Sequence, residues 1–197
     1  METDIYSFAF RGLLVEESLD KAGRMKYSPE AFYFSEEDAK KLFLYEIDER
    51  YVQQSKSMIT AFATITAFEN ATREFIHGVL YDNYKNDWWD KGIQPGIKSK
   101  AETRKANEDK VKWHINRGDA MMSYLDFGDL SKIMVSSDNW RLFEPYFAFD
   151  NGQQWIKSLF EDIEKSRNVI MHSGVLDEYA ISRIGLNVRD WLHQINV

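Results

Sequence analysis

Apolar and polar positions along the chain follow a helical period from Ser35 onward. The segment "SEED" that begins there is typical of a helix start, with Ser35 as the N-cap and acids in the first turn. Neither proline nor glycine then occurs before Gly78. The pattern therefore predicts one very long helix, or two stacked helices, over about residues 36–84.

Glycine and proline divide the rest of the chain into further helices. The segment "NDWWDKGIQPGI" interrupts the pattern. We expect a polar helix over about 99–116, short helices in "DFGDLSKIM" and "NWRLFEPYF", and a longer helix over about 152–172. After Gly174, helical spacing predicts a last helix from Ile181, Ile184, Val188, Trp191 and Ile195. The fold class is all-α, most simply an antiparallel helical bundle.

The first 34 residues carry a weaker pattern. The segment "SFAFRGLLVEESL" favours a short strand followed by a helix, and "KYSPEAFYF" favours an edge strand or a loop. No internal repeat and no low-complexity linker occurs in the sequence.

An arginine interrupts the apolar face of the 152–172 helix. Helix positions advance by about 100° per residue, and Arg167 falls at the centre of a stripe formed by Ile156, Leu159, Phe160, Ile163, Ile170 and Met171. A guanidinium cannot lose its proton, so a buried one needs acceptors. One interpretation is a structural arginine that joins helices through an acid. The other is a functional group.

A second charged pair interrupts the apolar face of the 36–84 segment. Glu69 and Arg73 lie within a stripe of Met58, Phe62, Ile65, Ile76 and Leu80. The two can pair along the helix, because they are four residues apart. Alternatively, Glu69 can face Arg167 across the bundle. Either arrangement places charge inside the bundle, and such costly layers often serve function.

His172 stands near the helix end, five positions after Arg167 and four after Asn168. Arginine can stabilise a phosphorane and histidine can move a proton, which suffices for metal-free RNA cleavage through the ribose 2′-hydroxyl. On one helix, however, Asn168 and His172 lie about 100° and about 140° from Arg167. Facing two such helices across the two-fold axis of a homodimer would bring both groups to one phosphorus atom.

Composition narrows the class of protein. The 197 residues are 44% hydrophobic and 15% aromatic, enough to build one domain, or one domain with an extension. The absence of cysteine excludes a disulfide scaffold and a Cys-based zinc site, and is typical of a reducing compartment. The N-terminus lacks a signal pattern, and no apolar run approaches about 18 residues. We therefore expect a soluble, cytoplasmic protein without a membrane partner.

Charge is distributed unevenly along the chain. The formal net charge is −7, which counts against a nucleic-acid binder. Between Lys98 and Arg117, however, seven Lys and Arg residues stand against three acids. This segment is either a solvated helix face or a strip that binds RNA phosphates. In the second case the candidate substrate-binding residues are Lys98, Lys100, Arg104 and Lys105.

Other chemical signals are weak. His77, His114 and His193 are scattered without a paired helical spacing, so we expect neither a metal site nor a cofactor. No phosphate-binding glycine motif occurs, and the isolated "DFG" lacks the other kinase signatures. Trp88 and Trp89 can stack on bases, although packing at a corner is the usual role of such residues.

The segment "SRNVIMHSG" resembles the signature of the HEPN superfamily, in which an arginine and a polar residue precede a histidine late in a helical bundle. The segment "FENATREFIHGVL" is similar to the early helix of that family, with its embedded acid and arginine. "NDWWDKGI" and "DFGDLSKIM…NW" resemble a branch linked to RNA processing and prokaryotic defence. The resemblance covers about residues 55–195, so we predict a HEPN-like domain over 55–197 and an extension over 1–54.

This resemblance implies a homodimeric, metal-independent endoribonuclease that is a toxin or antiphage effector. In that case Arg167 contacts the scissile phosphate, and His172 transfers a proton. Asn168 orients either the phosphate or His172. Glu69 holds Arg167, with Arg73 and Ser173 as further supporting residues. Other HEPN proteins have lost catalysis and only dimerise or bind nucleotides.

One departure from the family concerns its partners. Toxins paired with a nucleotidyltransferase often carry a tyrosine two positions after the histidine, where this chain has Gly174. This argues against an antitoxin that modifies such a tyrosine. A partner, an antitoxin or a fused regulator remain three open roles for residues 1–54, and an antitoxin or defence-system protein is the partner class that the resemblance implies.

Overall fold

The computed structural model of the protein describes residues 35–111, 113–118, 120–147 and 149–195. The strand and helix expected within residues 1–34 lie outside the described residues. The chain forms two compact units, which divide between Glu49 and Arg50.

The described part of the first unit contains two short helices, α2 (Glu36–Lys41) and η2 (Leu44–Glu46). The predicted cap is confirmed, because the Ser35 hydroxyl accepts a hydrogen bond of 3.0 Å from the backbone N–H of Asp38. Phe43 then adopts a left-handed φ of 55°, which ends the helical path. Of the two predicted alternatives for residues 36–84, one continuous helix was therefore wrong, and the long helix begins at Glu49.

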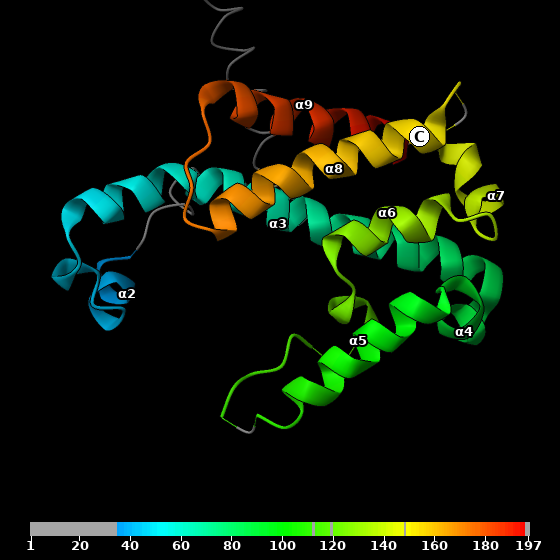
Figure 1. Cartoon of the computed structure of the whole chain (residues 1–197), viewed down its shortest axis with the longest axis horizontal. Helices are drawn as coiled ribbons and strands as arrows, with labels where there is room; N and C mark the ends of the chain where they lie inside the picture. Colours follow the sequence, from blue (N-terminus) through cyan, green and yellow to red (C-terminus); the bar gives the residue numbers. More distant parts are fainter. Residues whose placement is uncertain (1–34, 112, 119, 148, 196–197) are drawn as a thin grey trace, which may run out of the picture. The chain divides into compact units, whose positions relative to one another are not determined.

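The described ranges of the second unit consist of helices joined by turns and irregular connections, and they contain no strand (Figure 1). The all-α prediction is confirmed. In chain order its elements are α3 (Glu49–Tyr84), η3 (Lys85–Asp87), α4 (Trp88–Gly92), α5 (Pro95–Glu108), η4 (Met121–Tyr124), α6 (Phe127–Val135), α7 (Trp140–Phe143), η5 (Glu144–Tyr146), α8 (Gly152–Met171) and α9 (Glu178–Ile195).

Helix α5 differs from its predicted range of 99–116. It begins at Pro95, because proline is favoured in the first turn, where its missing N–H would have no partner. It ends at Glu108, and the chain then runs through turns to η4. Lys110 and Arg117 therefore do not extend the helix face that begins at Lys98.

Helices α3, α8 and α9 pack around an aromatic core. Helix α8 runs antiparallel to α3, because Phe68 meets Phe160 while Phe75 meets Phe147, which precedes α8. Trp191 of α9 is fully buried among these rings. Figure 1 shows α8 running beside α9. The Arg183 guanidinium joins them by a hydrogen bond of 2.9 Å to Asp162, which raises the pKa of Arg183.

The predicted apolar stripes follow the core along most of their length. On α8, Ile156, Leu159, Phe160 and Ile163 are buried. Two other stripe members are not: Met171 is 55% exposed, and Phe62 on α3 is 46% exposed. The apolar faces of α3 and α8 thus extend beyond the core where the end of α8 crosses α3, next to Arg167.

Candidate functional site

Glu69 joins two arginines inside the second unit. Its side chain is 8% exposed on α3 and forms an ion pair with Arg73, one turn further along the same helix. Its other carboxylate oxygen, Oε2, lies 3.4 Å from Nε of Arg167 on α8. Both pairings considered from the sequence therefore exist at once, because one carboxylate has two oxygens to offer.

Arg73 also fixes the segment that follows α5. Its Nε donates to the backbone carbonyl of Met122 at 3.1 Å, and its terminal nitrogen donates to that of Leu125 at 3.0 Å. These bonds hold η4 against the middle of α3. With four acceptors in all, counting Glu69 and Asn70, the guanidinium is well satisfied for its degree of burial.

Arg167 faces a hollow of about 420 Å³ that is lined by residues of α3, by the end of α8, and by Arg117 and Ser123. We call it the phosphate hollow. Its charged lining consists of Arg73, Arg117, Arg167 and Glu69. Arg117 also pairs with Glu108, at 2.6 Å. Three guanidinium groups stand against two carboxylates, Glu69 and Glu108, which leaves a local positive charge that suits an anionic group such as a phosphate.

His172 caps the C-terminus of α8, and a Schellman turn follows it. The N–H of Ser173 donates to the Ile170 carbonyl at 3.0 Å, and that of Gly174 donates to the Val169 carbonyl at 2.8 Å. Ser173, not the glycine, takes the left-handed conformation, with φ 61°. The glycine is needed for another reason: a Cβ on Gly174 would lie 2.6 Å from the Val169 side chain.

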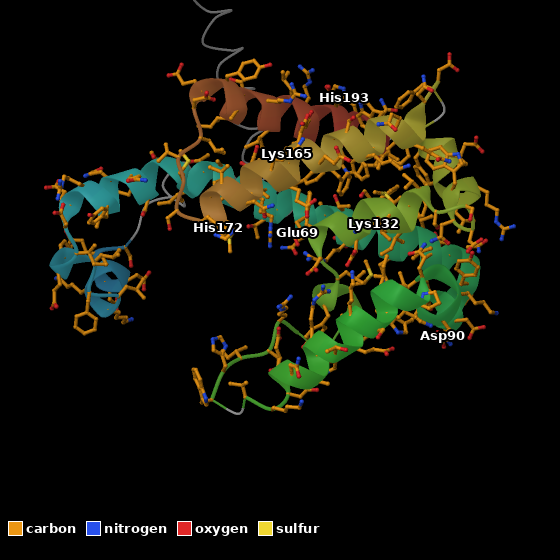
Figure 2. The ribbon with its side chains drawn as sticks, viewed as in Figure 1. Glu69, Asp90, Lys132, Lys165, His172 and His193 are labelled. Atoms are coloured by element: carbon orange, nitrogen blue, oxygen red, sulfur yellow. The ribbon has the colours of Figure 1, made fainter. Side chains whose placement is uncertain are left out.

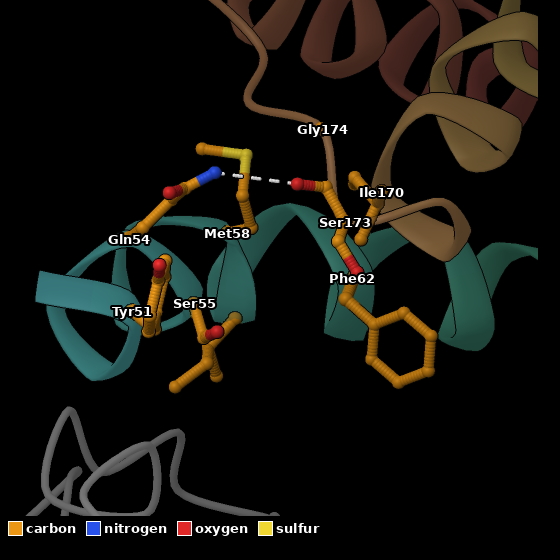
Figure 3. Close-up of a pocket in the computed structure, with 9 residues that line it drawn as sticks. Tyr51, Gln54, Ser55, Met58, Phe62, Ile170, Ser173 and Gly174 are labelled. Carbon is orange, nitrogen blue, oxygen red and sulfur yellow. Dashed lines mark hydrogen bonds between the residues drawn. The ribbon is translucent and has the colours of Figure 1, made fainter. Parts of the chain in front are cut away.

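This turn is fastened to the first turns of α3 (Figure 3). Gln54 donates its side-chain N–H to the backbone carbonyl of Ser173 at 3.2 Å. The N–H of Leu176 donates to the sulfur of Met58 at 3.2 Å. Beneath the turn lies a groove of about 540 Å³ with apolar walls that include Tyr51, Met58, Ile59, Phe62 and Ile170. The position of His172 is therefore set from α3 as well as from α8.

The imidazole of His172 is exposed at the end of α8, as Figure 2 shows, and forms no hydrogen bond within the described parts of the chain. Asn168 is likewise exposed. Neither residue lines the phosphate hollow. The structure thus brings Arg167, Glu69 and Arg73 together in one chain, and leaves His172 and Asn168 on the outside of α8.

Three of the four predicted substrate-binding residues on α5 have partners in the protein. Lys98 pairs with Asp90 at 2.7 Å. Arg104 donates to the Tyr124 carbonyl at 2.8 Å and pairs with Asp126. Lys105 pairs with Asp109 at 3.3 Å. The ammonium of Lys100 is exposed and forms no such contact with the described residues.

The sequence did not indicate four polar residues that line the phosphate hollow, namely Thr66, Asn70, Arg117 and Ser123. In the sequence Arg117 is only one member of the basic segment. Its place beside Arg167 could not be predicted, because it lies in an irregular connection where helical periodicity does not apply. Asn70 follows Glu69 directly, so its proximity to Glu69 and Arg73 could have been predicted. Ser123 carried no signal.

Within the described residues, no group of three or more His, Asp or Glu side chains is arranged to hold a metal ion. No helix in the same part of the chain combines the length and apolar character needed to cross a bilayer.

The site thus consists of an Arg-Asn-x3-His segment at the end of a late helix, with its arginine held by an acid on an early helix. The family model described as Swt1-like HEPN matches residues 64–196, about two thirds of the 197-residue chain. The chain therefore belongs to the Swt1-like HEPN family. No curated protein and no solved structure shows a significant match to it.

Proposed function

We propose that this protein is a metal-independent endoribonuclease that acts as a homodimer, in a toxin or antiphage role. The observation that carries the proposal is the placement of Arg167. It is held by the buried Glu69 and faces a hollow with a surplus of guanidinium groups. A half-buried arginine beside open space can bind a phosphate in a way that a fully enclosed structural bridge cannot.

The chemistry requires a proton acceptor near that phosphate, and His172 is the exposed histidine nearest in sequence. In the proposed reaction the imidazole takes the proton of a ribose 2′-hydroxyl. The 2′ oxygen of that ribose then forms a bond to phosphorus. The bond from phosphorus to the 5′ oxygen breaks, and that oxygen takes a proton from water. Arg167 stabilises the charge on the phosphorane. The products end in a 2′,3′-cyclic phosphate and a 5′-hydroxyl.

A second copy of the chain supplies the missing half of the site. Arg167 lines the phosphate hollow and His172 does not, so one chain does not present both to a phosphate bound there. Exposed apolar side chains lie around the end of α8, with Met171 55% and Val175 51% exposed. Such a patch beside polar residues favours a protein interface, and a two-fold axis there would pair Arg167 of one copy with His172 of the other.

The test uses the full chain, a labelled single-stranded RNA of mixed sequence, and EDTA. Wild type should cut and leave cyclic phosphate ends, while His172→Ala should lose the factor of about 10²–10⁴ that proton transfer contributes. His193→Ala is the matched control, since His193 is exposed on α9 and lies outside the proposed site. Full activity of His172→Ala would overturn the mechanism.

A second candidate is a non-catalytic dimer that binds RNA or nucleotides or acts as a regulatory module. The net charge of −7 and the pairing of the α5 cations with neighbouring acids both limit the number of RNA phosphates that the protein can contact. This counts against an enzyme that must hold an RNA strand for cleavage, and so it favours the non-catalytic candidate. In that case wild type and His172→Ala would bind the labelled RNA equally and neither would cut it.

A further inference from the structure

A second hollow adjoins the phosphate hollow along α3. It has a volume of about 340 Å³, and we call it the aromatic hollow. Both are lined by Asn70, Arg73 and Ser123, so the two hollows share a border. The aromatic hollow reaches His77, which is four residues, or about 6 Å, beyond Arg73 on the helix.

Two aromatic rings form a corner at the far end of this hollow. The rings of His77 and Trp88 are 4.7 Å apart between centroids and meet at 88°. Both residues are half-buried and line the hollow, so the corner borders open space. Perpendicular rings of this kind let a flat ligand stack on one ring while its edge meets the other.

Polar groups border the same corner. Glu74 lines the hollow with an exposed carboxylate that has no ion pair among the described residues, and Asn70 contributes its amide. The ring nitrogens of His77 likewise have no hydrogen-bond partner in the described ranges. A flat ligand with N–H and carbonyl groups on its edge would find both acceptors and donors here.

The charge of the two hollows differs in a way that matches a nucleotide chain. Arginines 73, 117 and 167 surround the phosphate hollow, whereas the aromatic hollow has Arg73 only at the shared boundary and Glu74 on its wall. A second phosphate is therefore a poor occupant of the aromatic hollow. A nucleobase, which is uncharged, flat and edged with polar groups, fits its lining.

We infer that the aromatic hollow is a nucleobase subsite that holds one unpaired base of an RNA strand whose neighbouring phosphate contacts Arg167. The inference rests on the proposed function for the identity of the strand. It requires single-stranded RNA, because a base in a duplex cannot leave its partner to stack on Trp88 without losing that pairing.

The test measures stacking directly, without needing cleavage. The full chain carrying His172→Ala is mixed with short single-stranded RNAs, each with the fluorescent base 2-aminopurine at one position. Stacking on an aromatic ring quenches this fluorophore. We expect quenching at a preferred position, its loss on adding Trp88→Leu, and its return with Trp88→Phe, which restores a ring. RNA affinity should fall by about 5- to 150-fold with Trp88→Leu.

Trp89→Leu is the matched control. Trp89 is an adjacent half-buried tryptophan whose ring packs against Trp88, 5.5 Å between centroids, but it does not line the hollow. It should keep both quenching and affinity, and the melting temperature of each variant reports folding. Absence of quenching, quenching that survives Trp88→Leu, or equal loss with both leucine variants would overturn the subsite.

The subsite and the nuclease can fail separately. Wild type that cuts RNA with unchanged KM in the Trp88→Leu variant would refute the subsite and leave the nuclease standing. Quenching that depends on Trp88, in a wild type that cuts nothing, would support the subsite and refute the nuclease.

Discussion

Nε of Arg167 lies 3.4 Å from Oε2 of Glu69, and this ion pair joins the last turns of α8 to the middle of α3. The same carboxylate holds Arg73, which in turn binds the backbone of η4. One buried acid thus connects three segments of the domain. It also sets the direction of the guanidinium that we propose to contact RNA.

Glu69→Gln should destabilise the domain strongly. The substitution keeps the volume of the side chain but leaves two neighbouring guanidinium groups without their shared anion. Removing one partner from a largely buried ionic network typically costs about 3–5 kcal/mol in free energy of unfolding, and urea denaturation measures it.

The control for Glu69 is Asp87→Asn. Asp87 pairs with Lys91 on the surface, where both side chains are about 60% exposed, and such pairs contribute less than about 1 kcal/mol. Equal effects of the two substitutions would contradict a central role for Glu69.

Mixing two inactive variants should restore cutting if the site is shared between copies. In a dimer of one Arg167→Ala chain and one His172→Ala chain, one composite site keeps both functional groups and the other keeps neither. Because half of randomly mixed dimers are of this kind, activity should return to about a quarter of the wild-type level.

The mixture is compared with each variant alone after the chains have been exchanged by mild denaturation and refolding. A site built from Arg167 and His172 of the same chain would give no recovery. Size-exclusion chromatography with light scattering provides the mass of the species assayed.

The turn after α8 should respond in opposite directions to two neighbouring substitutions. Ser173→Gly relieves a left-handed residue, and should raise the free energy of unfolding by up to about 1 kcal/mol. Gly174→Ala forces a Cβ to within 2.6 Å of Val169, and should lower both the stability and the cutting rate by displacing His172. Thermal unfolding of both variants checks the signs, and a stabilising Gly174→Ala would contradict the close approach.

Arg104 and Lys100 should separate structural from RNA-binding cations on α5. Arg104→Met removes a hydrogen bond to the Tyr124 carbonyl and an ion pair to Asp126, so it should lower stability by about 1–3 kcal/mol. Lys100→Met should leave stability within about 0.5 kcal/mol.

Lys100→Met also distinguishes the two interpretations of the basic strip on α5, a solvated helix face or a surface that binds RNA phosphates. If the strip contacts RNA phosphates, Lys100→Met should reduce the slope of log affinity against log salt by about 1. An unchanged slope would identify the strip as a solvated helix face.

Much of the fold could be predicted from the sequence, because the signals that define a helix lie in residues close together in the chain. The helix expected over 152–172 is α8, Gly152–Met171, since its apolar period and its terminal turn are both encoded within about twenty residues. The start of α5 was predicted too late, at residue 99. The sequence signal at Pro95 is ambiguous, because proline usually interrupts a helix but is also favoured as its first residue.

Only part of the candidate site could be predicted from the sequence. Arg167 and Glu69 stood out because each breaks an apolar stripe, and such a break is visible in one dimension. The contribution of Arg117 and the corner of His77 and Trp88 were not visible, because an irregular connection and two different helices bring those residues together.

The sequence by itself determined the all-α class, the α8 helix with its interrupted stripe, and the HEPN resemblance, because periodicity and a short motif are properties of neighbouring residues. Only the tertiary structure decided that Glu69 serves two arginines, that His172 lies outside the hollow that Arg167 faces, and that Ser173 takes the left-handed turn. These depend on contacts between α3 and α8, which are far apart in the chain, and on steric fit at Gly174. Packing settles such contacts by excluding every arrangement in which the side chains overlap or a buried charge lacks a partner.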